Sequence, residues 1–224
     1  MKLNIINLGF MDYRAALQIQ EELFSLRGQG RIGDALLLVE HPPVITLGRR
    51  GNFDNILLAR GYLEERGVGI YEVNRGGDVT YHGPGQLVGY PIMDLTGHGR
   101  DVKAFVWKIE EIFIRLLGEE YGLTANREAD KYTGVWVDNR KVTAIGVHIS
   151  RWITMHGFAF NVNTDLSHFG WINPCGITDK GVTSVQQLTG VRQDFDRVTQ
   201  KVSDYFCKIF EVEGVACTKE SLPG

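Results

Sequence analysis

Residues 75–92 read RGGDVTYHGPGQLVGYPI, a pattern that fits neither a regular helix nor a regular strand. Four glycines and Pro84 fall within residues 76–85. Glycine lets the backbone pass close to a ligand, and Pro84 fixes its own φ and disfavours the helical region for Gly83. The apolar residues 86–94 that follow indicate a strand. We therefore expect a shaped loop on a rigid support, as in many binding sites, although such a loop also suits a tight hairpin connection.

Three blocks of the chain resemble one family of enzymes, the lipoyl(octanoyl) transferases of the lipoate-attachment superfamily. The blocks are HPPVITLG at residues 41–48, RGGDVTYHGPGQL at 75–87 and RKVTAIGVHISRWITMHGFAFNVNTDLSHFGWINPCGI at 140–177. They follow the family's order and together span most of the chain. Phe160 stands where leucine is more common in the family, a difference that changes packing volume but no chemistry.

Length and composition are those of an ordinary globular protein. The 224 residues suit one α/β domain, and we expect residues 1–224 to form a single catalytic domain. Hydrophobic residues make up 43% and charged residues 23%, so neither disorder nor a fibrous repeat is indicated. The net charge of −3 gives no whole-chain attraction for nucleic acid, and we expect no nucleic-acid partner.

Cysteine usage and the N-terminal sequence predict a cellular location. The three cysteines form no CxxC pair and leave one unpaired under any disulfide scheme, which favours reduced thiols. Residues 1–20 contain neither an unbroken apolar segment nor a small-residue cleavage site, and no stretch reaches the roughly 18 apolar residues of a membrane span. We therefore expect a cytoplasmic protein without a membrane partner.

Apolar patterns and turn residues predict the elements of the N-terminal half. The expected strands lie at residues 2–9, 34–40, 44–48, 68–73 and 86–94, and the expected helices at 13–28 and 58–66. Asp12 is a suitable N-cap for the first helix, which ends near Gly28. The continuous apolar run at 34–40 is typical of a strand buried on both faces. His41 follows it at a corner, where a turn or capping role is ordinary for histidine.

The C-terminal half continues this alternation. We expect a helix between Asp101 and Gly122, two strands within residues 134–148, a strand at 153–162, a helix after Asp194 and a short strand after Glu213. Asp138 and Asn139 tolerate the left-handed geometry of a hairpin turn between the two strands. Strands in the middle with helices around them predict an α/β (α+β) fold with a mixed, mainly antiparallel central sheet. The resemblance implies the biotin/lipoate-ligase-like version of that fold.

Two residues are candidates for catalysis, and each also has an ordinary structural reading. Cys175 lies in the turn sequence Asn-Pro-Cys-Gly, although a cysteine is more often a buried small hydrophobe. Cys207 and Cys217 lack such a context, and we assign both to structure. A thiol with a pKa near 8.5 needs a neighbouring cation or base to react at neutral pH. Lys141 follows the predicted hairpin, where a lysine is normally a solvated surface charge.

The residues alone leave the partner of Cys175 open. A cysteine–histidine pair is the common arrangement, and it would use His148, His156 or His168 as the base. The resemblance instead implies a pair of Lys141 and Cys175, because the family's lysine opens a K-x-x-x-I-G strand and its cysteine lies in P-C-G. As implied by the family, Lys141 stabilises the Cys175 thiolate, and backbone N–H groups near Gly76, Gly77 or Gly176 stabilise the oxyanion.

The resemblance also implies the substrates. The donor is an octanoyl thioester on the phosphopantetheine of acyl carrier protein, and the acceptor is a specific lysine of lipoyl domains, as in 2-oxoacid dehydrogenase E2 subunits and the glycine cleavage H protein. Transfer from a thioester to an amide is downhill, so we expect no requirement for ATP, a metal or another cofactor. The absence of a GxxxxGK[ST] motif agrees with this expectation. The partner proteins are typically acidic, and a docking face would use Arg49, Arg50, Arg60, Arg75 and Arg151.

The acyl chain needs a dry channel, which also keeps water from the covalent intermediate. The residues that correspond by motif position are Arg75, Gly76, Gly77, Asp78, Val79, Thr80, Tyr81, His82, Ala144, Ile145, Gly146, Gly157, Phe158 and Ala159. Gly146 and Gly157 interrupt strands, as at a close backbone approach or a bulge. We expect His82 to order the loop rather than to act on the thioester.

Two other functions compete with this interpretation. An ATP-dependent lipoate–protein ligase shares the implied fold and acceptor, but that family resembles R-R-x-G-G-G-x-V-x-H at the loop and uses no P-C-G cysteine. A non-catalytic protein that binds the acyl carrier would keep the pocket as a scaffold. The presence of both Lys141 and Cys175 favours the transferase over each of them.

Overall fold

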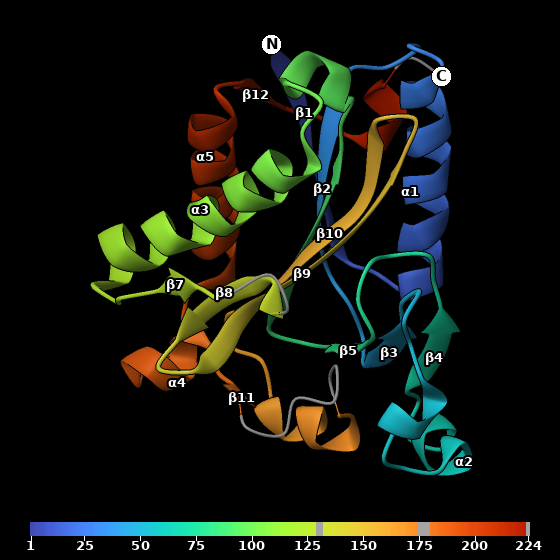
Figure 1. Ribbon diagram of the computed structural model, residues 1–224, viewed down its shortest axis with the longest axis vertical. Helices are drawn as coiled ribbons and strands as arrows, with labels where there is room; N and C mark the ends of the chain where they lie inside the picture. Colours follow the sequence, from blue (N-terminus) through green and yellow to red (C-terminus); the bar gives the residue numbers. More distant parts are fainter. Residues whose placement is uncertain (129–131, 174–179, 223–224) are drawn as a thin grey trace.

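The computed structural model describes residues 1–128, 132–173 and 180–222, whose strands form two sheets (Figure 1). The larger sheet has the order β12-β1-β2-β6-β10-β9-β8-β7 with β11 paired to β9, and the smaller has the order β4-β3-β5. The strands are β1 Lys2–Phe10, β2 Asp34–Glu40, β3 Val44–Leu47, β4 Gly69–Glu72, β5 Val79–His82, β6 Gln86–Ile92, β7 Asn126–Arg127, β8 Gly134–Val137, β9 Arg140–Ser150, β10 Ile153–Asn161, β11 Gly181–Val182 and β12 Glu213–Ala216. The α-helices are α1 Tyr13–Gly28, α2 Arg60–Glu64, α3 Val102–Tyr121, α4 Val185–Thr189 and α5 Phe195–Phe210.

Strand direction in the larger sheet is mixed, as the sequence predicts. β1 pairs in parallel with β2 and with β12, and β11 pairs in parallel with β9. The remaining pairs, from β2 through β6, β10, β9 and β8 to β7, are antiparallel. The smaller sheet packs below one end of the larger sheet and carries α2 (Figure 1).

The predicted starts of the three long helices and the predicted hairpin turn are confirmed. The Asp12 side chain accepts hydrogen bonds from the N–H groups of Arg14 and Ala15 at the start of α1. Asp101 and Asp194 cap α3 and α5 in the same way. Between β8 and β9, Asp138 and Asn139 have φ values of 49° and 59°, the left-handed pair of a two-residue hairpin turn.

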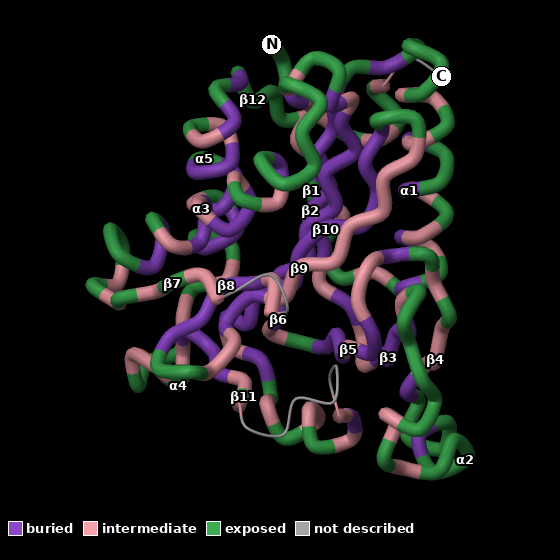
Figure 2. Tube along the Cα trace, viewed as in Figure 1, coloured by how far each residue is buried: buried purple, intermediate pink, exposed green. Residues whose placement is uncertain are grey.

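The two faces of the larger sheet bury different cores. α3 and α5 cover one face, where the apolar cluster includes Phe113, Phe158 and Phe160. α1 covers the other face, where Leu23 packs on alternate residues of β2 and β6. Figure 2 shows the central strands buried between these helices, while the outer helix faces are exposed. Alternation along each strand therefore assigns neighbouring side chains to opposite layers.

Several elements differ from the sequence prediction. Residues Val79–His82, expected to belong to a loop, form the strand β5. The helix expected at 58–66 is shorter, because Ala59 provides no capping side chain for α2. α4 and a 3₁₀ helix at Leu166–Trp171 lie where no regular helix is expected. Their short lengths give too few residues for a recognisable period. None of the described helices is both long enough and apolar enough to cross a lipid bilayer.

Candidate active site

The glycine-rich loop is held in shape by the Arg75 side chain. Its guanidinium donates to the carbonyl oxygens of Thr46, Gly76 and Asp78 at 2.8, 2.9 and 2.7 Å. Gly77 has a φ of 88°, which favours glycine. Gly48 lies so close beneath the loop that a Cβ atom there would stand 2.5 Å from the Gly77 carbonyl oxygen. The loop is therefore a rigid wall, and most of the donor capacity of Arg75 serves the backbone of that wall.

The Asp78 carboxylate connects the loop to another segment. It accepts hydrogen bonds from the backbone N–H of Asn52 and from the side-chain amide of Asn55. The Asn55 carbonyl in turn accepts from the N–H of Asn173 at 2.8 Å. Asn173 is the last described residue before the Pro-Cys-Gly sequence, so the loop and the N-terminal flank of that sequence share one hydrogen-bonded framework.

His82, at the end of β5, is fixed by a chain of amide side chains. The Asn161 amide donates to the Thr183 carbonyl, and the Gln86 amide donates to the carbonyl of Tyr81 and to Asn161. The Gln86 Oε1 atom is therefore an acceptor, and His82 Nδ1 donates to it at 2.7 Å. Since burial lowers the pKa of His82 to about 3, the ring is neutral with its lone pair on Nε2. This arrangement agrees with an ordering role for His82.

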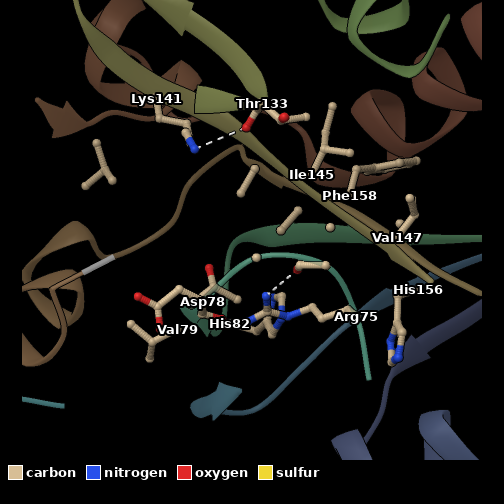
Figure 3. A pocket seen from close by; sticks show the side chains of 18 of the residues that line it. Arg75, Asp78, Val79, His82, Thr133, Lys141, Ile145, Val147, His156 and Phe158 are labelled. Atoms are coloured by element: carbon tan, nitrogen blue, oxygen red, sulfur yellow. Dashed lines mark hydrogen bonds between the residues drawn. The ribbon is translucent and has the colours of Figure 1, made fainter. Parts of the chain in front are cut away.

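A cavity of about 960 Å³ opens between this loop and the edge of the larger sheet (Figure 3). From the loop it is lined by Arg75, Gly76, Gly77, Asp78, Val79, Thr80 and His82, and from β9 and β10 by Ala144, Ile145, Gly146, Gly157, Phe158 and Ala159. Gly146 is required there, because a Cβ atom would stand 2.8 Å from the Gly76 carbonyl oxygen. The structure thus brings together thirteen of the fourteen residues expected around the acyl chain.

Tyr81 is the exception and lies away from the cavity. Alternation along β5 turns its side chain into the smaller sheet's core, where its ring packs against Phe169 and Trp171. Its hydroxyl is hydrogen-bonded to His168 Nδ1 at 2.7 Å. Burial and the charge of Asp165 raise the pKa of this hydroxyl. The placement of Tyr81 in the cavity lining therefore needs correction, since position in a motif does not reveal which face a strand residue takes.

Lys141 lies at the same cavity, beside the hairpin that the sequence predicts. Its Nζ atom donates to the Thr133 carbonyl at 3.2 Å and stands 4.7 Å from the centre of the buried Trp136 ring. Lys180 approaches the same ring at 4.9 Å and forms an ion pair with Glu128 at 2.9 Å. Two ammonium groups therefore share one indole, an arrangement favoured by the negative face of the ring.

Both described flanks of the Pro-Cys-Gly sequence reach the cavity that Lys141 lines, and the C-terminal flank pairs with the strand of Lys141. Asn173 and Lys180 both line the cavity. β11 pairs with β9 in the register Val182 to Lys141, and the N–H of Thr183 donates to the Lys141 carbonyl at 3.0 Å. Cys175 and Gly176 themselves lie outside the described residues. Cys207 lies on α5 and Cys217 follows β12, both partly buried, as expected for structural cysteines.

The histidines that compete with Lys141 occupy different places. His148 Nδ1 accepts from Arg49 at 2.8 Å, and burial with this guanidinium lowers the pKa of His148. His168 lies on the 3₁₀ helix against Tyr81. His156 lines the cavity, and its positive φ of 57° turns it toward Asn74, whose Oδ1 accepts from Nε2 at 3.0 Å. Burial lowers the pKa of His156 to about 3, so this ring is a weak base.

The innermost part of the cavity carries neutral polar rings. Tyr13, Tyr90 and His156 line it. His41 stands behind them, where its Nδ1 donates to the Met11 carbonyl and its Nε2 accepts from the Tyr90 hydroxyl. Burial lowers the pKa of His41 to about 4 and raises the pKa of Tyr13 to about 12. The corner position of His41 is confirmed, and its buried hydrogen bonds explain why that corner is rigid.

Several residues that line the cavity could not be identified from the sequence pattern. Lys180 reaches the cavity through the pairing of β11 with the distant strand β9, and Trp136 reaches it from the β8–β9 hairpin. Val102, Lys103, Val106 and Trp107 line it from α3, although the apolar period of that helix indicates only a core face. Among the described residues, no group of histidine, cysteine, aspartate and glutamate side chains has a geometry that could hold a metal ion.

Comparison with known proteins gives consistent matches along the whole chain. The sequence profile of the lipoyl protein ligase A/B catalytic domain matches residues 12–207. An octanoyltransferase of Caldicellulosiruptor saccharolyticus is 54% identical over 99% of this chain and 94% of the relative. An octanoyltransferase of Desulforamulus reducens is 58% identical over 95% of this chain and 93% of the relative.

Solved structures share the fold at low identity. A lipoate-protein ligase A bound with ATP superimposes with a TM-score of 0.78 at 17% identity, covering 100% of this chain and 93% of the other. A biotin protein ligase from Aquifex aeolicus gives a TM-score of 0.56 at 14% identity, covering 93% of this chain and 70% of the other. These likenesses establish the biotin/lipoate-ligase-like fold.

Proposed function

Because the chain belongs to the lipoyl protein ligase A/B catalytic-domain family and is an enzyme of the octanoyltransferase kind, we propose that it moves octanoyl groups from acyl carrier protein through a thioester on Cys175. The acceptor is a specific lysine of lipoyl domains, such as those of 2-oxoacid dehydrogenase E2 subunits and the glycine cleavage H protein. One observation carries the proposal. Lys141 lines the same cavity as Asn173 and Lys180, the two described flanks of the Pro-Cys-Gly sequence, and the segment after Lys180 pairs with the strand of Lys141.

In the first half-reaction, the Cys175 thiolate attacks the carbonyl carbon of the octanoyl thioester. A new carbon–sulfur bond forms, and the carbon–sulfur bond to pantetheine breaks. The departing pantetheine thiolate takes a proton from the Lys141 ammonium. The products are an octanoyl-Cys175 thioester, a free pantetheine thiol and a neutral Lys141 amine.

In the second half-reaction, the neutral amine of the acceptor lysine attacks the octanoyl-Cys175 carbonyl. Lys141 removes a proton from the attacking nitrogen, and the Cys175 thiolate leaves as the amide forms. Lys141 and Cys175 thereby return to their starting states. The Gly76 N–H already donates to the Val147 carbonyl at 2.9 Å, which leaves Gly77 and Gly176 as candidate oxyanion donors.

The reaction needs no cofactor of its own in this scheme, and we propose that neither ATP nor a metal takes part. We place it in the cytoplasm, where acyl carrier protein and reduced thiols are available. A direct assay separates this transferase from an ATP-dependent ligase. Octanoyl-acyl carrier protein and a lipoyl domain are incubated without ATP, and the mass of the lipoyl domain is measured. We expect a gain of one octanoyl group, whereas modification only with free octanoate and ATP would favour the ligase.

A further inference from the structure

The cavity reaches both faces of the larger sheet at the edge of β9. Val88, Tyr90 and Ala159 line it and belong to the α1-side core, whereas Ile145 and Val147 line it and pack against the α3-side core. β8 pairs with β9 only as far as Ala144, and beyond that residue the Gly76 N–H of the loop donates to the Val147 carbonyl at 2.9 Å. Figure 3 shows Ile145, Val147 and Phe158 on one side of the β9 and β10 ribbons, with Arg75, His82 and His156 on the other.

The α3-side part of the cavity forms a groove, here called the α3 groove. It is lined by Val102, Lys103, Val106 and Trp107 of α3 and by Ile145 and Val147 of β9. Val102 and Trp107 are 40% and 48% exposed, so the groove opens to solvent at the N-terminal end of α3. Its other end lies at Glu110, whose Oε1 accepts from the N–H of Gly134 next to Lys141. Along the helix, the eight residue steps from 102 to 110 span about 12 Å.

The size of the cavity exceeds what an acyl chain of eight carbons occupies. Pockets for ligands of drug size measure about 300–1,000 Å³, and this cavity of about 960 Å³ lies at the upper end. The residues expected around the acyl chain belong to the loop, β9 and β10, and only Ile145 of them also lines the α3 groove. The α3 groove is therefore a part of the same cavity that the acyl chain leaves largely unused.

Resting on the proposed function, we propose that the α3 groove binds the phosphopantetheine arm of the acyl donor. The thioester carbonyl is trigonal, so the acyl chain and the sulfur substituent leave the carbon in directions roughly 120° apart. An acyl chain beside the loop therefore needs a separate path for the sulfur substituent, and the α3 groove provides a path from the cavity to solvent. The open end of this groove leaves the carrier protein outside the cavity.

The chemistry of the groove suits this arm. Pantetheine is uncharged and combines methylene groups and a branched dimethyl carbon with two amides, and the groove offers Val102, Val106 and Val147 as apolar surface. The arm ends in a phosphate, and Lys103 lies in the first turn of α3 at the open end. A lysine ammonium and the positive end of a helix both attract phosphate.

The test uses three donors that share the octanoyl thioester but differ in the thiol. They are octanoyl-N-acetylcysteamine, octanoyl-pantetheine and octanoyl-phosphopantetheine. Acylation of the enzyme is followed by intact mass for the wild type, Val102→Trp and Lys103→Glu. Val191→Trp and Lys108→Glu are the matched controls, since Val191 is exposed, Lys108 is half-buried on the same helix as Lys103, and neither lines the cavity.

We expect Val102→Trp to lower kcat/KM about tenfold for the two pantetheine donors and to leave the truncated donor unchanged, because a blocked groove loses apolar contact. Lys103→Glu is expected to lower kcat/KM about fivefold for the phosphorylated donor alone. Both controls should behave as the wild type does.

Normal acylation of both groove variants by all three donors would overturn the inference while leaving the proposed function intact. Normal acylation with slower transfer to a lipoyl domain would also overturn it, and would assign the groove to the acceptor lysine. A wild type that gains no acyl group from octanoyl-acyl carrier protein would contradict the proposed function, and the inference with it.

Discussion

The two walls of the cavity use their polar groups differently. On the loop wall, the Arg75 guanidinium donates to backbone carbonyl groups, and the His82 imidazole donates to the side-chain amide of Gln86. On the opposite wall, Lys141 and Lys180 bring two ammonium groups to the Trp136 ring beside the flanks of the Pro-Cys-Gly sequence. The loop wall therefore holds the shape of the cavity, and the Lys141 wall carries the positive charge that we propose serves the reaction. Substitutions on the first wall should cost stability, and those on the second should cost rate.

The largest effect is expected at Lys141. Lys141→Ala should lower kcat for octanoyl transfer by about 10³-fold, because general acid–base groups contribute about 10²–10⁴-fold. The free energy of unfolding should change little, since Lys141 is only partly buried. Steady-state transfer and urea unfolding measure the two quantities, with Lys201→Ala on the surface of α5 as the control. A Lys141→Ala variant that keeps its transfer rate but loses stability would contradict the roles assigned to the two walls.

On the loop wall, Arg75→Met should lower the free energy of unfolding by about 3 kcal/mol, because it leaves several buried carbonyl groups without a donor. Arg50→Met is the matched control, since Arg50 also borders the cavity but is exposed. Its unfolding free energy should equal that of the wild type. Equal stability of the two variants would show that the loop does not depend on the Arg75 hydrogen bonds.

The neutral histidines should make stability depend on pH. His41, His82 and His156 have folded pKa values lowered to about 4, 3 and 3 by burial. Their contribution is complete above the unfolded pKa of about 6.5 and is lost as the pH falls from there toward the folded values. As the pH falls from 7 to 5.5, each of these histidines should lower the free energy of unfolding by about 1 kcal/mol. The free energy of unfolding is measured in urea against pH for the wild type and for His82→Gln. Its dependence on pH should be about one third weaker in His82→Gln, and an identical dependence would contradict a neutral buried His82.

The smallest effect is expected at Tyr81, which belongs to the glycine-rich loop but lies away from the cavity. Tyr81→Phe removes the hydrogen bond to His168 and should lower the free energy of unfolding by about 1 kcal/mol. Octanoyl transfer at saturating and limiting donor should be unchanged, because this side chain lies in the core of the smaller sheet. A raised KM for the octanoyl donor would return Tyr81 to the acyl-binding residues.

Much of the fold was predictable because its signals are local. Asp12, Asp101 and Asp194 cap helices through bonds to residues two or three positions away, and Asp138 and Asn139 form a turn by themselves. Nearly all of the residues that the motif positions of the loop, β9 and β10 predicted line the cavity, although many other lining residues were not predicted.

What could not be predicted depends on contacts between distant segments. The amide chain from His82 to Thr183 joins residues a hundred positions apart, and no local pattern encodes it. His156 takes a positive φ in mid-strand, so alternation alone assigns its side chain to the wrong face. Lys180 reaches Trp136 only through the pairing of β11 with β9.

The covalent role of Cys175 beside Lys141 is tested most directly by intact mass. The wild type, Cys175→Ser and Lys141→Ala are each incubated with octanoyl-acyl carrier protein in the absence of ATP. We predict that the wild type gains one octanoyl group that hydroxylamine removes, that Cys175→Ser gains no such group and that Lys141→Ala gains it far more slowly. A hydroxylamine-sensitive octanoyl group on Cys175→Ser, or acylation of Lys141→Ala at the wild-type rate, would contradict the pairing of these two residues.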